Sequence, residues 1–418
     1  MPPERAAWLA APFRPFYLLG VAYAIGLMVL AGLGLAGIAP GAFPMAWHGH
    51  EMIFGFALSL IAGTALTALP SWAGIAETRG AVLALLAAAW LLGRVACFFG
   101  AVGWSWPWPW SWRWVAACDI ALPLAIVARL AVPLARLPER RWLAPLAVFG
   151  LLALANLGWH AAAAAGDTHA AALALRAALW LVVVMFTLAG GLFTPVFTGN
   201  VLAARALGPD VRDRARALSP PVSLPLEVAA LAALVALALV DLFDATRAAA
   251  VVAPLALWLQ AWRVARWRGW RVANDALVGS MHLGFLWLLA ALALKALTSL
   301  AQLTPASSLA PPGATWTVAP WPEAAWVHAF TVGALGSMAL GLMTRVVLRH
   351  TGRPLAAPAA LPWLLLAVNV AAVLRVAAPA LGAWAWPAAS ALWVAAFAAW
   401  LAVHAPMLLR PSLPRAQS

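Results

Sequence analysis

Apolar residues fill long uninterrupted stretches of this chain, and polar residues gather in short breaks between them. A helix needs about 20 mostly apolar residues to cross the hydrocarbon core of a bilayer. With Pro, Gly and Arg clusters taken as the breaks, the pattern predicts twelve spanning helices. Their expected ranges are 15–38, 46–70, 80–101, 114–135, 142–163, 171–197, 222–241, 245–265, 275–301, 322–348, 360–378 and 384–403.

The composition supports lipid as the solvent of this chain. Of its 418 residues 65% are hydrophobic and 9% are charged, and the mean hydropathy is +0.92. No connection is long enough for a soluble domain, so we expect one integral membrane domain over residues 1–418. The first apolar run exceeds a signal-peptide core and a second follows closely, so it is expected to remain as helix one. The fold class is therefore predicted to be an all-α polytopic membrane bundle.

The basic residues indicate orientation rather than a nucleic-acid partner. The net charge is +13, but the arginines are scattered between apolar runs and form no basic face or nucleic-acid reading motif. Nineteen of the 26 Lys and Arg residues fall on the termini and the even-numbered loops, and four fall on the odd-numbered loops. Because positive charge is retained on the cytoplasmic side, both termini are predicted to be cytoplasmic.

Two outer loops and two cysteines have ordinary interpretations. The tract WSWPWPWSWRW, residues 104–114, is predicted to be an aromatic anchor in the headgroup layer, with a lid over an outer site as the alternative. The Pro-rich loop near 304–322 is also predicted to face outward. Cys97 and Cys118 are expected to be small buried residues rather than a disulfide.

Topology sorts the eight histidines by depth. His48 and His50 open the second helix from the outer side, His160 closes the fifth, and His328 lies near the outer end of the tenth. Ionisable side chains in spanning segments are costly and usually bind something. Imidazoles suit haem iron, copper or zinc, whereas thiolates and carboxylates are too few for an iron–sulfur cluster or a hard-metal cage. The sequence therefore predicts histidine-ligated centres in the outer half of the bundle.

The other four histidines fall elsewhere. His282 and His350 lie in the inner half, where they hold a separate centre or supply hydrogen bonds. His169 is expected on the surface of an outer loop, and His404 is expected to be an interfacial residue without a partner.

The stretch MAWHGHEMIFGF, residues 45–56, sets two histidines two positions apart. Residues i and i+2 of a helix point about 200° apart. His48 and His50 can grip one ion only if Gly49 unwinds the turn, and we favour the alternative in which they serve two centres. Glu51 can orient an imidazole, pass protons or bind a quinol-like ligand.

Several blocks together resemble the NnrS family. They are FRPFYLLG (13–20), WHGHEMIFGFALSLIAGTALTALPSWAG (47–74), NLGWH (156–160), GGLFTPVFTGN (190–200), HLGFLWL (282–288) and HAFTVGALGSMALGLMTRVVLRHTGRPL (328–355).

The resemblance implies a twelve-helix protein of the bacterial inner membrane that carries haem b and copper and is associated with denitrification and nitric oxide tolerance. The matching blocks carry over six histidines as ligands: His48, His50, His160, His282, His328 and His350. Which histidine binds which metal stays open.

Four arginines are candidate partners for haem propionates through charge-assisted bonds: Arg94, Arg345, Arg349 and Arg353. For the last three the alternative is a positive-inside role alone. The family usually has basic residues where this chain has Leu192 and Gly199, so any anion contact at those two positions is in doubt.

Three functions are compatible with these features. The first is a haem and copper protein that binds or turns over nitric oxide, with electrons from quinol or another donor and Glu51 on the proton route. The second is a transporter or channel, although no convincing repeat relates the two halves. The third is a quinol-dependent nitric oxide reductase analogous to the haem-copper oxidases, although this chain lacks their adjacent His-His pair.

Overall fold

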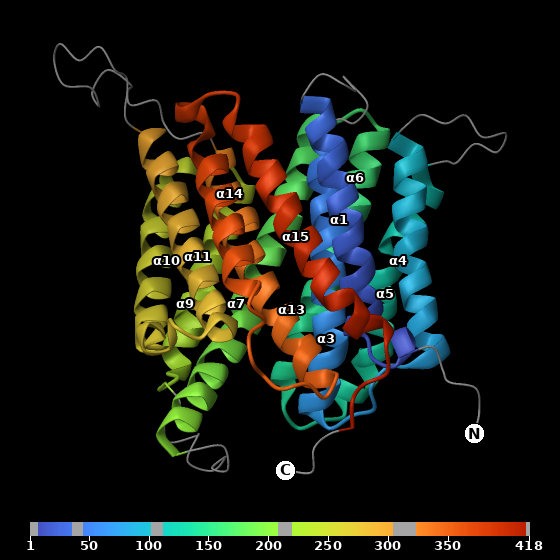
Figure 1. Cartoon of the computed structure of the whole chain (residues 1–418). Coiled ribbons are helices and arrows are strands. Elements are labelled where there is room, and N and C mark those ends of the chain that lie inside the picture. Colours follow the sequence, from blue (N-terminus) through green and yellow to red (C-terminus); the bar gives the residue numbers. More distant parts are fainter. Residues whose placement is uncertain (1–6, 36–44, 102–111, 208–219, 304–322, 415–418) are drawn as a thin grey trace. The chain divides into compact units, whose positions relative to one another are not determined.

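The computed structural model describes residues 7–35, 45–101, 112–207, 220–303 and 323–414. These residues form helices and connections with no strand among them (Figure 1). Twelve of the described helices are long and apolar enough to cross a bilayer, so the chain is an all-α polytopic membrane bundle. Most of the tryptophan tract and the Pro-rich loop at 304–322 lie outside the described residues.

The predicted spans agree with the observed helices to within a few residues at most ends. The largest difference is the sixth span, which runs nearly three turns further than predicted and tolerates Pro195 in its interior. The elements are η1 (Ala7–Leu9), α1 (Phe13–Leu35), α2 (Met45–His50), η2 (Glu51–Ala57), α3 (Leu58–Ala73), α4 (Gly80–Ala101), α5 (Trp112–Ala135), η3 (Arg140–Leu143), α6 (Ala144–Ala164), α7 (Thr168–Leu207), α9 (Leu224–Leu242), α10 (Thr246–Arg266), η4 (Gly269–Val272), α11 (Ala276–Ala301), α12 (Ala324–His328), η6 (Ala329–Leu335), α13 (Gly336–His350), α14 (Leu361–Leu381) and α15 (Ala385–Leu409).

The chain divides into two compact units. The first unit comprises residues 1–185, 343–356 and 397–418, and the second comprises residues 186–342 and 357–396. Helices α7, α13 and α15 contribute to both units.

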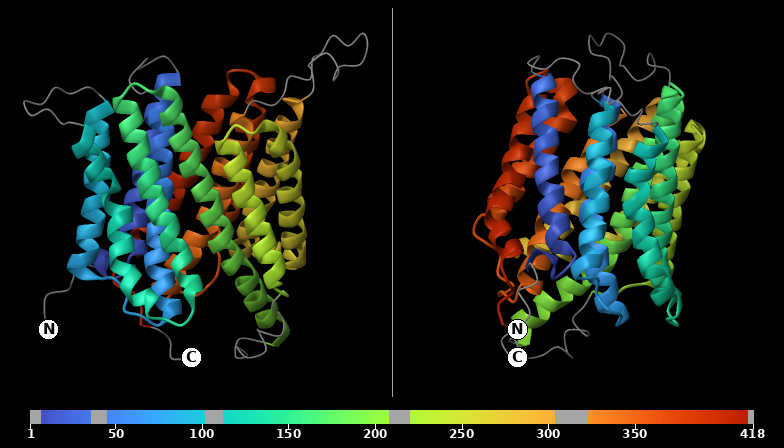
Figure 2. Two further views of the ribbon diagram at one scale, coloured as in Figure 1. Left: turned by 180° about the vertical axis from the view of Figure 1, so that it is seen from behind. Right: turned by 90° about the vertical axis from the view of Figure 1, so that its right-hand side faces the viewer.

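In the first unit, close helix contacts depend on small residues. A Cβ atom on Gly20 of α1 would lie 1.9 Å from Ser59 Oγ, and one on Gly63 of α3 would lie 3.0 Å from Phe16. Such contacts are typical of membrane helices, where close backbone approach replaces the hydrophobic effect as the source of association. Helices α4, α5 and α6 follow as consecutive neighbours (Figure 2).

The start of α1 contacts the end of α15 in the first unit. The guanidinium of Arg14, 1% exposed, donates to the carbonyl oxygens of Leu408 and Arg410 at 2.8 and 2.7 Å and to Ser412 Oγ at 2.9 Å. Leu408 lies in the last turn of α15 and Arg410 directly follows it, where backbone carbonyls lack helical partners. The start of α1 and the end of α15 therefore lie close together in this unit, and the cytoplasmic location of the termini stays a prediction.

In the second unit, α9, α10 and α11 are consecutive neighbours, and α11 and α14 both pack against η6. Arg263 of α10 is buried and pairs with Glu227, and its guanidinium lies against Gly191. A Cβ atom on Gly191 would lie 1.6 Å from Arg263 Nη2, so any larger residue there would displace the guanidinium. A basic group thus reaches the Gly190–Gly191 region from α10.

Candidate metal centre

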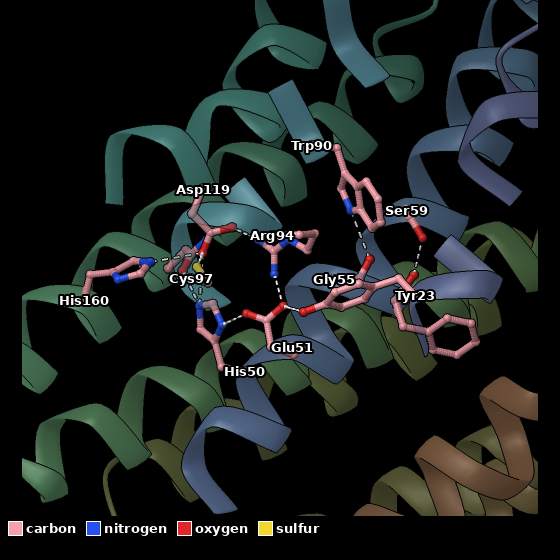
Figure 3. Close-up of polar contacts among 12 residues, drawn as sticks. Tyr23, His50, Glu51, Gly55, Ser59, Trp90, Arg94, Cys97, Asp119 and His160 are labelled. Carbon is pink, nitrogen blue, oxygen red and sulfur yellow. Dashed lines mark hydrogen bonds and ion pairs between the residues drawn. The ribbon is translucent and has the colours of Figure 1, made fainter. Parts of the chain in front are cut away.

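Five charged or titratable side chains from five elements form a buried cluster in the first unit (Figure 3). We call it the His50 cluster. No member is more than 5% exposed, which is costly in a bilayer unless each group is paired. The members are His50 at the end of α2, Glu51 at the start of η2, Arg94 of α4, Asp119 of α5 and His160 of α6.

The two imidazoles converge on one carboxylate oxygen. Asp119 Oδ2 lies 3.0 Å from His160 Nε2 and 3.1 Å from His50 Nε2. The Cys97 thiol reaches the same oxygen at 3.4 Å, and Asn156 Oδ1 lies 2.9 Å from His50 Nε2. Nitrogen and sulfur atoms of the kinds that bind metals therefore converge on Asp119 Oδ2, which can itself bind a metal.

The ring of His50 is held from several sides. Its Nδ1 lies 2.9 Å from Glu51 Oε1, and its ring stacks on Trp159 at 4.0 Å between centroids. Phe54, one turn along η2, contacts the ring at 4.9 Å. A carboxylate on the outer nitrogen of an imidazole fixes its tautomer and orientation, as in many metal-binding histidines.

Arg94 joins the two carboxylates of the cluster. Its Nη1 lies 2.5 Å from Glu51 Oε2, and its Nη2 pairs with Asp119 Oδ1. The preceding residue explains this approach of α4 and α5, because a Cβ atom on Gly93 would lie 3.0 Å from Asp119 Cα. The glycine allows the helices to come close enough for the ion pair.

The helix itself is irregular at the cluster. Seven residues from Glu51 to Ala57 form a π-helix directly after His50. Such segments are rare and occur frequently at functional sites. The ring of Tyr23 from α1 packs directly against the backbone at Gly55, and the Tyr23 hydroxyl donates to Glu51 Oε2. Hydrogen bonds and ion-pair contacts thus link Tyr23 through Glu51 and His50 to Asp119 and His160.

The charges and protons of the cluster leave room for a cation. Two carboxylates face one guanidinium, and both ring nitrogens of His50 face carboxylate oxygens, which carry no hydrogen when ionised. A metal ion bound between His50 Nε2 and Asp119 Oδ2 would satisfy both atoms.

Within the described ranges, two groups of three side chains bring metal-binding atoms within 4.8 Å of one another. The first is His50, Asp119 and His160, which we call the His50–Asp119–His160 triad. The second is His50, Glu51 and Cys97, which shares His50 with the triad.

The comparison with known families extends over nearly the whole chain. The family model described as NnrS protein matches residues 7–412. The chain belongs to the NnrS family. None of the curated proteins matches it.

The six histidines that the NnrS blocks carry are not all brought together. In the first unit His50 and His160 meet, with ring centroids 5.3 Å apart. His48 is half-buried in α2, which is a regular helix as far as His50, so the two imidazoles point to different sides as their spacing predicts. His350 is half-buried at the end of α13, 5.7 Å from the Phe13 ring.

Two of the six belong to the second unit of this NnrS chain. His282 is 7% exposed, and its Nε2 lies 2.8 Å from Thr198 Oγ1. Because that hydroxyl donates to the carbonyl oxygen of Thr194, it accepts from His282. His328 is half-buried, and its Nδ1 donates to the carbonyl oxygen of Ala324 at 2.6 Å.

The remaining predicted positions give one correction. His169 is exposed as expected, and Cys97 and Cys118 are free thiols. The expectation for His404 is wrong. It is 1% exposed, its Nδ1 donates to the carbonyl oxygen of Trp400 at 2.8 Å, and its ring stacks on Trp400. Helix α15 continues to Leu409, beyond the predicted end, which places His404 inside the helix.

Sequence reasoning missed the carboxylate at the centre of this NnrS site. Asp119 is an acid inside a spanning segment, which is a signal in its own right. Asn156 precedes His160 by four residues and therefore shares its face of α6. Arg345, a predicted propionate partner, is buried in α13, and Arg94 is bound to both carboxylates of the cluster.

Proposed function

We propose that this protein is a haem- and copper-binding protein of the bacterial inner membrane that binds or turns over nitric oxide in denitrification or nitrosative-stress tolerance. Membership of the NnrS family and the twelve spanning helices support this proposal. The observation that carries it is the convergence of two imidazole nitrogens and one carboxylate oxygen in the His50–Asp119–His160 triad.

The donor set suits a transition-metal ion. An ion with imidazole and carboxylate bonds of about 2.0–2.2 Å holds neighbouring ligand atoms about 2.9–3.5 Å apart. The separations from Asp119 Oδ2 to the two imidazole nitrogens are 3.0 and 3.1 Å. Imidazole and carboxylate together fit copper, zinc or iron, and copper is the choice that the family suggests.

The surrounding side chains prepare the triad for a cation. Glu51 accepts from His50 Nδ1, so the Nε2 lone pair is directed to the centre of the triad. Arg94 offsets the charge of one of the two carboxylates. Trp159 and Phe54 cover the ring of His50 and exclude water from that side.

Copper supplies a redox-active centre when bound, and ferrous haem supplies an iron that takes up a diatomic gas. The residues of the chain then handle protons. Glu51 lies between the Tyr23 hydroxyl and His50 Nδ1, so it can pass a proton along this hydrogen-bonded path. Reducing equivalents would come from quinol or another electron donor.

Metal analysis of the purified full-length protein, produced with haem and copper supplied, tests the proposal. We expect copper and haem in the wild type, and loss of copper in His160→Ala and Asp119→Asn. His169→Ala is the matched control because His169 is exposed on α7. Absence of either copper or haem from the wild type would falsify the proposed function. Copper retained in full by both variants would refute the triad as its site.

A further inference from the structure

Two segments of the chain share the same irregular helix. The π-helix Glu51–Ala57 follows His50, and a second π-helix, Ala329–Leu335, follows His328. Both contain seven residues, and both directly continue a short α-helix that ends in histidine. Because π-helical segments are rare, two of equal length after a histidine indicate a repeat.

The sequence at a shift of 278 positions supports this repeat. His50, Gly55, Ser59 and Gly63 correspond to His328, Gly333, Ser337 and Gly341. These residues are few, and the surrounding apolar residues differ, which is why the repeat is weak in the sequence.

The packing of each segment against its neighbour repeats as well. In the first unit the ring of Tyr23 crosses at Gly55, and in the second the ring of Trp287 crosses at Gly333. A Cβ atom would lie 2.6 Å from the first ring and 2.3 Å from the second. Tyr23 and Trp287 are 264 positions apart.

Two further contacts follow the same two shifts, 264 positions from α1 to α11 and 278 positions from α2–η2–α3 to α12–η6–α13. Gly63 packs on Phe16, and Gly341 packs on Ser280, which is 264 positions after Phe16. Gly20 and Gly284, also 264 positions apart, approach Leu60 and Met338 respectively. The pairs α1 with α2–η2–α3 and α11 with α12–η6–α13 are therefore two copies of one helix pair.

A third helix extends the correspondence. Helix α4 carries Arg94-Val95-Ala96, and α14 carries Arg375-Val376-Ala377. Asn369 of α14 contacts Ser337, and α14 runs antiparallel to η6 after the intervening turn. Arg375 lies six residues after Asn369, and Thr331 lies six residues before Ser337. Because the two segments are antiparallel, Arg375 is near the level of Thr331, three residues from His328.

The two copies differ in the charges they offer. Ala329 stands where the first copy has Glu51, so the second copy has no carboxylate at that position. The Nδ1 of His328 donates to a backbone carbonyl instead, which leaves Nε2 as the nitrogen with the lone pair. Among the described residues, half-buried Arg375 lies over the Trp386 ring at 4.9 Å and makes no hydrogen bond or ion pair.

The His328 imidazole alone gives too few ligands for a bare metal ion, and the Arg375 guanidinium is a cation that adds none. Such an ion needs about three protein donors or more, and neither metal-capable group of the described chain contains His328. Haem brings four nitrogen ligands and two propionates of its own, so a single imidazole and a single guanidinium are enough to bind it.

We propose that the second copy binds haem, with His328 Nε2 as an axial ligand of the iron and Arg375 as the partner of a propionate. The first copy, with Glu51, Asp119 and His160 at hand, binds the bare ion. The inference rests on the proposed function, because it assumes that the protein carries both cofactors.

The experiment compares haem and copper in single variants of the full-length protein. In His328→Ala we expect haem content to fall at least about tenfold, equivalent to about 1.4 kcal/mol, because the iron loses a protein ligand, while copper stays at the wild-type level. The reverse is expected for His160→Ala. His328→Met keeps a ligand of similar length, so haem is retained with a shifted absorption spectrum if this residue binds the iron.

Arg375→Leu tests the propionate contact separately. We expect weaker haem retention and a lower midpoint potential, because removal of a nearby positive charge favours the oxidised iron. Arg247→Leu, on an exposed position of α10, is the matched control. Copper content and elution as a monodisperse peak report whether each variant folds.

The haem content of the wild type and of the His328 variants separates failure of the His328 assignment from failure of the proposed function. If the wild type contains haem and His328→Ala and His328→Met both keep it with an unchanged spectrum, the assignment to His328 is wrong and the proposed function stands. If the wild type contains no haem, the proposed function and this inference both fail.

Discussion

At the scale of single residues, Asp119 determines which side chains form a site. Its Oδ2 atom brings together His50 and His160, which are 110 positions apart in the chain, and its Oδ1 atom pairs with Arg94. Sequence reasoning had found both histidines, Glu51 and Arg94. It had not found Asp119, because one acid in an apolar run gives no sign of what it faces.

The same contacts predict how metal affinity depends on pH. Imidazole nitrogens and carboxylate oxygens bind an ion only where they carry no proton, so protons compete with the ion for the His50–Asp119–His160 triad. Affinity is therefore expected to fall as the pH is lowered, by about tenfold per pH unit for each proton displaced. Chelator competition at several pH values measures this slope. A flat profile would mean that the ion does not compete with protons in the triad.

Glu51→Gln isolates the role of the carboxylate behind His50. Glutamine keeps the shape but loses the charge that holds the imidazole. Because such outer partners change metal affinity by about 10–100-fold, we expect copper to be bound more weakly rather than lost. Complete loss would assign Glu51 to the metal itself, and unchanged affinity would remove it from the site.

At the scale of helical elements, the π-helices depend on glycines that allow an aromatic ring to cross. Gly55 and Gly333 lie under the rings of Tyr23 and Trp287. The two copies keep this steric arrangement while the polar residues around it differ. Packing therefore preserves the shared backbone, and the side chains at positions 51 and 329 set the chemistry.

Alanine at either glycine tests this arrangement. In Gly55→Ala and Gly333→Ala the added methyl group meets an aromatic ring, and such overpacking costs about 1–3 kcal/mol. Gly26→Ala is the control, because no atom lies within 4 Å of a Cβ atom at Gly26 of α1. Thermal unfolding in detergent measures the difference. Equal midpoints for the three variants would show that the rings move aside without cost.

At the scale of the whole molecule, Arg14 ties the first spanning helix to the last. It donates to carbonyl oxygens at the end of α15 and to Ser412, and it is almost completely buried. The FRPFYLLG block thus has a structural role in which the arginine satisfies the end of a distant helix.

Removal of this link should destabilise the first unit. In Arg14→Ala the carbonyl oxygens lose a charged donor, and hydrogen bonds to charged groups contribute about 1.5–3 kcal/mol each. We expect a lower unfolding midpoint and no loss of the ability to bind copper below it. Arg136→Ala, at an exposed position, is the control. An unchanged midpoint would show that water replaces the guanidinium without penalty.

The sequence by itself determined the number of spans, their approximate limits and the membership of a family. Each span is set by its own length of apolar residues, which is a local property that lipid imposes. It also favoured the arrangement in which His48 and His50 point to different sides, but only the regular helix α2 excluded an unwound turn at Gly49.

Only the tertiary structure decided which of these residues meet. The meeting of Asp119 with His50 and His160 depends on how α4, α5 and α6 rotate and approach, and glycines such as Gly93 control that approach. The repeat was likewise hidden, because four shared residues are a weak signal until their contacts coincide. Hydrophobicity fixes the depth of a residue in the bilayer, whereas the packing of small residues between helices fixes its partners.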